Sequence, residues 1–100
     1  MRTYFGNPCF FVMNIKTFRF NAFAENTYLI WDEANIGAII DPGCSNFDEE
    51  NQLVEFINKE NIDLKHHLLT HAHIDHVFGC NFTFNHYGLA PRFYHLEKTL

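Results

Sequence analysis

The sequence predicts an α/β fold, in which helices lie beside a mixed β-sheet. Three observations point to this class. Residues 13–20 place apolar side chains in the manner of a half-buried strand, and residues 36–40 form a continuous apolar run, typical of a strand buried on both faces. Residues 46–60 instead repeat apolar side chains at the spacing of an amphipathic helix. Strand and helix patterns alternate along the rest of the chain, which is the order expected of α/β architecture.

Three strands are expected in the first part of the chain. The strand over 13–20 carries apolar Met13, Ile15, Phe18 and Phe20, with a break in alternation near Lys16 and Thr17. Residues 26–31 and 36–40 are expected to form a hairpin around the polar residues 32–35.

A turn and a helix follow. Asp41, Pro42 and Gly43 have turn chemistry and end the third strand. Ser45 or Asn46 can cap a helix, because an acidic residue, Asp48 or Glu49, comes three positions later. The helix is expected to reach about Glu60 and to bury Leu53, Val54, Phe56 and Ile57.

The last part of the chain repeats the strand and helix order. A strand is expected over 64–69, a helix over 76–87 that ends at Gly88, and a strand over 90–94. His66 and His67 fall inside the first of these strands. Because neighbouring side chains of a strand point to opposite faces, the two imidazoles cannot converge on one site, and both are interpreted as structural.

Composition limits the possible partners. At 100 residues one domain is the upper bound, and the net charge of −5 without a basic run makes nucleic acid and anionic membranes poor partners. The chain is 47% hydrophobic and carries 12 Phe. That richness fits either a partial domain whose sheet face expects a partner layer or an ordinary core that favours Phe.

The sequence also bears on location. No run approaches the ~18 apolar residues of a membrane span, and residues 1–12 do not read as a signal peptide but as an N-terminal extension. The three cysteines, Cys9, Cys44 and Cys80, are odd in number and form no C-x-x-C pair. A reducing compartment, the cytoplasm, is therefore expected.

Four metal-capable side chains lie within six residues: His71, His73, Asp75 and His76. His71 and His73 are two apart and can converge on one ion if the chain is extended there, and a turn into the next helix would bring Asp75 and His76 to the same space. Imidazole and carboxylate ligands suit Zn²⁺, with Fe or Mn as alternatives, in one or two ions. The other interpretation is a His-rich solvated loop, or histidines that serve as helix caps.

The same four residues also match the pattern of a known sequence motif. The run from His71 to His76 resembles the HxHxDH motif of metallo-β-lactamase-fold hydrolases, above all the glyoxalase II-like branch. Three flanking stretches resemble the family's strand, turn and helix-start patterns: residues 26–30, 39–43 and 77–81. The resemblance runs from about Asn14 to the end of the chain.

The resemblance implies a fold and an activity. The fold is the N-terminal half of a metallo-β-lactamase-type αββα sandwich. The activity is ester or thioester hydrolysis by metal-bound hydroxide, as in hydroxyacylglutathione hydrolases, with a small ester or thioester as substrate. His71 and His73 would hold the first ion, Asp75 and His76 the second, and Asp75 would also act catalytically by orienting the attacking hydroxide. Asp41 would steady the metal pocket from behind the ligands, or would serve only as a turn residue.

The family's downstream ligand motifs are not found in these 100 residues. Residues 13–100 are therefore expected to be a partial domain, truncated at its C-terminus, and enzymatic activity stays open. One hypothesis is a hydrolase completed by a complementary C-terminal half. The alternative is an inactive fragment that binds metal weakly and self-associates through an uncovered sheet face. In either case the chain alone is expected to bind Zn²⁺ loosely, below two equivalents.

Overall fold

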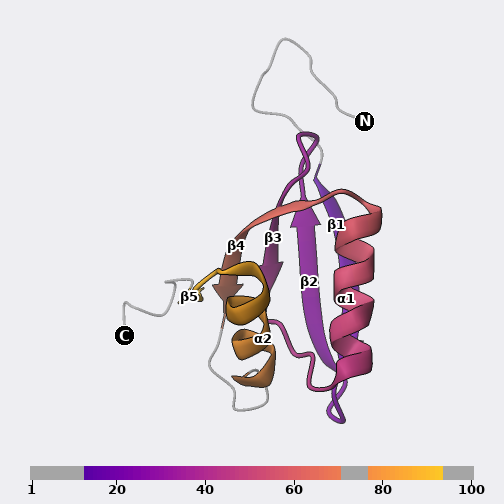
Figure 1. Cartoon of the computed structure of the whole chain (residues 1–100), viewed down its shortest axis with the longest axis vertical. Helices are drawn as coiled ribbons and strands as arrows, with labels where there is room; N and C mark the ends of the chain where they lie inside the picture. Colours follow the sequence, from indigo (N-terminus) through magenta and orange to yellow (C-terminus); the bar gives the residue numbers. More distant parts are fainter. Residues whose placement is uncertain (1–12, 71–76, 94–100) are drawn as a thin grey trace.

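A computed structural model describes residues 13–70 and 77–93 of the chain. Within these residues five strands form one mixed sheet, and two helices lie on the same side of it, in front of the sheet in Figure 1. In chain order the elements are β1 (Asn14–Phe20), β2 (Glu25–Trp31), β3 (Ile36–Ile40), α1 (Phe47–Lys59), β4 (Asp63–Leu69), α2 (Val77–Tyr87) and β5 (Arg92–Phe93). The predicted α/β class is confirmed.

The sheet order follows the chain order, β1-β2-β3-β4-β5. The pairs β1/β2 and β2/β3 are antiparallel, whereas β3/β4 and β4/β5 are parallel. Helix α1 makes the crossover between the two parallel strands β3 and β4, as parallel pairing requires. The carboxyl ends of β3 and β4 consequently meet at one edge of the sheet, where α2 also begins (Figure 1).

The predicted element boundaries agree with the structure to within one or two residues. The helix cap resolves the choice between two residues: the side chain of Asn46 accepts a hydrogen bond from the Glu49 backbone N–H at 2.9 Å, so Asn46 is the cap. Of the last predicted strand, 90–94, the described part of the chain forms a strand at Arg92–Phe93. The second helix spans Val77–Tyr87 in the structure, and the expected first residue, His76, lies outside the described residues.

The expected break in the alternation of β1 does not interrupt the strand. Lys16 takes a position on the helix-covered face, where its ammonium lies 5.5 Å from the ring centres of both Phe18 and Phe56. A lysine can occupy this position because its stem covers apolar surface while its charge meets aromatic faces at the rim. The pattern looked broken only because the residue at the covered position is charged.

The core lies between the sheet and α1. Leu53 and Ile57 of α1 are buried, and the ring of Phe56 packs edge-on against Phe18 and Trp31, with centroids 5.8 and 5.5 Å apart. Edge-to-face packing at these separations is favourable for aromatic pairs. The buried cluster contains Phe18, Phe20, Leu29, Trp31, Ile39, Cys44, Leu53, Ile57, Ile62 and Leu64.

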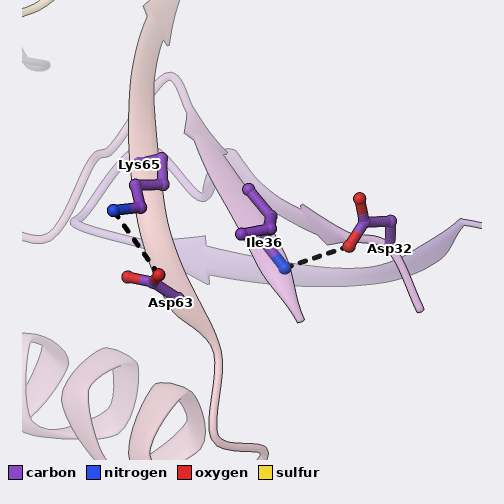
Figure 2. Close-up of polar contacts among 4 residues, drawn as sticks. All are labelled: Asp32, Ile36, Asp63 and Lys65. Carbon is purple, nitrogen blue, oxygen red and sulfur yellow. Dashed lines mark hydrogen bonds and ion pairs between the residues drawn. The ribbon is translucent and has the colours of Figure 1, made fainter. Parts of the chain in front are cut away.

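The β2–β3 hairpin is closed by the side chain of Asp32. Its Oδ1 accepts hydrogen bonds from the backbone N–H groups of Ala34 at 2.9 Å and Ile36 at 3.0 Å, the second of which Figure 2 shows. Asn35 has a φ of 65°, a left-handed conformation that asparagine tolerates well. The predicted turn over 32–35 is thereby explained by Asx chemistry.

The opposite face of the sheet carries no helix in the described part of the chain, and apolar side chains occupy much of it, beside the polar Thr17 and His66. Strand register aligns Ile15, Ile30 and Ala38 in one row and Tyr28, Ile40 and Leu68 in the next, and Ile15 is 66% exposed. The structure also confirms that His66 and His67 point to opposite faces, since His66 is exposed and His67 is 1% exposed. Over residues 13–70 and 77–93, neither helix has the length and apolarity to cross a membrane.

We expect this apolar face to make the isolated chain self-associate and bind the dye ANS, because large exposed apolar patches act as interfaces. Ile15→Lys should lower both the apparent mass in size-exclusion chromatography and the dye fluorescence. Phe47→Lys is the matched control, since Phe47 is 71% exposed but lies on α1. A monomeric, dye-free wild-type chain would contradict the expectation.

Candidate functional site

The predicted ligands His71, His73, Asp75 and His76 lie outside the described residues. What the structure does describe is the frame on both sides of them, from Thr70 at the end of β4 to the first turn of α2. Among the described residues no group of three or more His, Cys, Asp or Glu side chains could hold a metal. A metal site of the predicted kind therefore depends on the motif itself.

Asp41 fixes the residue that directly precedes the motif. Its side chain is 4% exposed, and its carboxylate accepts hydrogen bonds from the Thr70 backbone N–H at 2.8 Å and from the Thr70 hydroxyl at 2.5 Å. Its own N–H donates to the Leu68 carbonyl at 2.9 Å. Asp41 also has a φ of 54°, so it bends the chain as a turn residue does. The two interpretations of Asp41, as turn former and as support behind the motif, are thus compatible.

Thr27 holds the Asp41 turn from the neighbouring strand β2. Its fully buried hydroxyl donates to the Asp41 carbonyl at 2.9 Å and accepts from the Gly43 N–H at 2.8 Å. A second bond reaches the same turn, because the Asn21 side-chain amide donates to the Gly43 carbonyl at 3.0 Å. A buried polar group needs such partners, so the turn and the strand lock each other.

Gly79 brings α2 against the same turn. A Cβ at this position would lie 2.1 Å from the Pro42 carbonyl oxygen and 3.0 Å from the Gly43 nitrogen. Only a glycine permits this approach of helix to backbone. Both ends of the motif are therefore anchored on residues 41–43, Thr70 by hydrogen bonds and α2 by direct packing.

Glu49 extends the frame to the β1–β2 turn. One carboxylate oxygen accepts from the Asn21 N–H at 2.7 Å, and the other accepts from the Ser45 N–H at 2.8 Å. The start of α1 is thereby tied to the neighbouring turn at the same edge of the sheet. The acidic residue expected as part of the helix cap thus has a second, tertiary role.

The cysteines near the turn are protonated thiols. Burial, reinforced by Glu50, raises the pKa of Cys44 to about 12, and burial also raises the pKa of Cys80. Neither forms a disulfide. The raised pKa values favour a packing role for both cysteines over a redox role, because thiolates are the reactive form.

A pocket of 430 Å³ lies between the first turns of α1 and the outer side of α2. It is lined by Ser45, Glu50, Asn81, Phe82, Asn85 and His86. His86 stacks on the ring of Phe82 with centroids 5.1 Å apart, which explains its position without a ligand role.

Sequence reasoning did not single out Thr27, Gly79 and Glu49 for these roles. Thr27 and Gly79 stand inside short stretches that the family resemblance covers, but a threonine in a strand and a glycine in a helix have many uses. The available signal for Gly79 was that a glycine near the start of a helix is costly and so needs a packing reason.

Comparisons with known proteins agree with the resemblance. Residues 21–98 match the family described as the Metallo-beta-lactamase superfamily. The chain is 40% identical over 77 residues to hydroxyacylglutathione hydrolase GloC of Haemophilus influenzae, which covers 77% of this chain and 34% of that protein. It is 37% identical over 73 residues to hydroxyacylglutathione hydrolase of Pelagibacter ubique, covering 72% and 28%.

A solved structure shares the fold. The crystal structure of BLEG-1 B3 metallo-beta-lactamase superposes with a TM-score of 0.68 and 22% identity, over 78% of this chain and 35% of that one. The chain spans about a third of the length of the curated relatives that it matches.

Gly79→Ala should lower the free energy of unfolding by about 3 kcal/mol, because overpacking against rigid backbone cannot relax cheaply. Gly88→Ala is the control: Gly88 has a φ of 72° and open space around it, so alanine there should cost only about 1 kcal/mol of backbone strain. Urea denaturation of both variants measures the difference. Equal losses would mean that α2 is not held tightly against residues 41–43.

Cys44 should make the folded state less stable in alkali. Its pKa in the folded state, about 12, lies above the ordinary cysteine pKa of 9.0. The unfolded chain therefore loses this proton first, and stability should fall as pH rises from about 9 towards 12. The free energy of unfolding, measured against pH for the wild type and for Cys44→Ala, should fall less steeply in the variant over that range.

Alkylation tests the burial of Cys44 separately. In the folded chain at pH 8, alkylation of Cys44 by iodoacetamide should be far slower than in urea; rapid alkylation would contradict its burial.

Proposed function

Because the chain belongs to the metallo-β-lactamase superfamily, we propose that it forms part of a metal-dependent hydrolase that cleaves the thioester of a hydroxyacylglutathione or a similar small ester. The observation that carries the proposal is the position of the motif. Three histidines and an aspartate occupy a segment whose flanking residues, Thr70 and the first turn of α2, are both anchored on residues 41–43. The names of the two curated relatives support the substrate class.

The donor set fits zinc. Imidazole nitrogen and carboxylate oxygen are ligands that Zn²⁺ accepts, and Fe or Mn would fit the same set. His71 and His73 would hold one ion, and Asp75 and His76 a second. When bound, such a metal lowers the pKa of water and polarises the carbonyl of the substrate.

The chain's own residues would position this chemistry. The carboxylate of Asp75 would accept a hydrogen bond from the attacking water and orient it towards the carbonyl carbon. Asp41 would act at a distance, by holding Thr70 and thus the first residue of the motif. Gly79 would hold the residues after the motif, because it lets α2 pack against Pro42 and Gly43. Errors of about 1 Å in such positions cost ~100-fold in rate, so the anchors matter as much as the ligands.

The proposal concerns the whole protein. Since the chain spans about a third of its curated relatives, turnover is proposed for the motif together with whatever completes its ligand set. A second candidate is a metal-binding chain without turnover that associates with itself or with a complementary C-terminal half. The exposed apolar face of the sheet, with Ile15 at 66% exposure, favours such association.

We also propose a reducing compartment, the cytoplasm, as its location. Cys44 and Cys80 are free thiols in the described part of the chain, and free buried thiols persist where glutathione keeps them reduced.

Metal binding and turnover test the function separately. Equilibrium dialysis against Zn²⁺ should give binding below two equivalents, and His73→Ala should weaken it by at least ~100-fold, since it removes a direct ligand. His66→Ala is the matched control, because His66 is an exposed imidazole of β4 outside the motif. Turnover is measured on this chain together with the part that completes its ligand set. There His73→Ala should abolish hydrolysis of a hydroxyacylglutathione thioester, and His66→Ala should not. Zinc binding unaffected by His73→Ala would refute the assignment.

A further inference from the structure

A second pocket lies along β4. It has a volume of 330 Å³ and is lined by Lys65, His66, His67, Leu89, Ala90 and Arg92. Lys65 precedes Thr70 by five residues, which in an extended strand is about 16 Å. His67, which also lines the pocket, precedes Thr70 by three residues, about 10 Å in an extended strand. The interpretation of the pocket does not depend on the proposed hydrolysis.

The lining of this pocket is basic. Lys65 and Arg92 are cationic side chains and His66 is an exposed imidazole, whereas no carboxylate is among the lining residues in the described part of the chain. The whole chain has only seven Lys and Arg against twelve Asp and Glu. A pocket with two cations and no acid thus stands out against the acidic background.

The nearest carboxylate partner of Lys65 does not neutralise the pocket firmly. Lys65 Nζ lies 3.5 Å from an Asp63 side-chain oxygen, the contact that Figure 2 shows, and both side chains are more than half exposed. Exposed pairs of this kind contribute little stability. The lysine can therefore turn from Asp63 to a ligand at small cost.

His67 supplies an independent observation. Its side chain is 1% exposed, and its Nδ1 lies 3.0 Å from the Leu89 carbonyl oxygen, so Nδ1 carries the proton and donates. Its Nε2 is buried and has no hydrogen-bond partner among the described residues. Burial lowers the pKa of His67, although the bond to Leu89 and the charge of Asp41 act in the opposite direction. A buried polar atom without a partner is costly, and here it belongs to a residue that lines the basic pocket.

We propose that this pocket binds a small oxyanion, the phosphate or carboxylate group of a metabolite. The planar guanidinium of Arg92 suits two oxygens of one group, and the ammonium of Lys65 supplies a second positive charge. A volume of 330 Å³ is at the small end of ligand pockets, which fits a compact anion rather than a large cofactor.

The test uses inorganic phosphate and acetate as probes. Each is titrated into the protein at constant ionic strength, balanced with sodium chloride, while NMR follows the ring signals of His66 and His67. We expect saturable shifts with at least one probe, and the tighter of the two identifies whether phosphate or carboxylate is the preferred group. Chloride alone should leave both rings unchanged.

Variants locate the site. Arg92→Gln and Lys65→Gln should each weaken binding about tenfold, the loss expected for one charged hydrogen bond. Lys59→Gln is the matched control, since it removes the same charge from α1 outside the pocket. All three positions are exposed, so circular dichroism should show an unchanged fold. Shifts that chloride reproduces, shifts that survive in the Arg92 and Lys65 variants, or no saturable shift with either probe would each overturn the proposal.

Discussion

The frame around the motif depends on the buried carboxylate of Asp41. Its oxygens take both donors of Thr70, its N–H is bonded to β4, and its carbonyl is bonded to Thr27 of β2. Gly79 then lets α2 rest on the next two residues of the same turn. A carboxylate at 4% exposure is tolerated only when it is hydrogen-bonded, so these partners cannot be lost singly without a large cost. Strands β2 and β4 and helix α2 are thereby all held against the turn formed by residues 41–43.

Topology explains why that turn is where function is expected. Parallel β3 and β4, joined by α1, end at the same edge of the sheet, and in open α/β sheets the carboxyl ends of strands are where ligands bind. Glu49 fastens the β1–β2 turn to the start of α1 at this edge as well. The basic pocket on β4 lies elsewhere on the same strand, at Lys65, His66 and His67. A single strand therefore contributes to two chemically different regions.

Family membership and fold rest on different observations. The hydrolase relatives are identified by sequence, at 37–40% identity over roughly three quarters of this chain. The similarity to a solved β-lactamase, at 22% identity, concerns the arrangement of the chain alone. Both comparisons cover about a third of the longer proteins, and the described residues account physically for what that third does. It builds one helix-covered sheet and holds Thr70 and the start of α2, the residues on either side of the predicted motif, against residues 41–43.

The sequence by itself determined the α/β class, nearly all element boundaries and the candidate ligands, because periodicity, turn residues and motif spacing are local properties of the chain. It also predicted opposite faces for His66 and His67, since strand alternation is local too. Only the tertiary structure decided which polar residues meet. Asp41 and Thr70 are 29 positions apart, and Thr27 and Gly43 are 16 apart, and no local pattern records such pairs. The same reason hid the role of Gly79: its need to be glycine comes from the carbonyl of Pro42, which only the folded chain brings within reach.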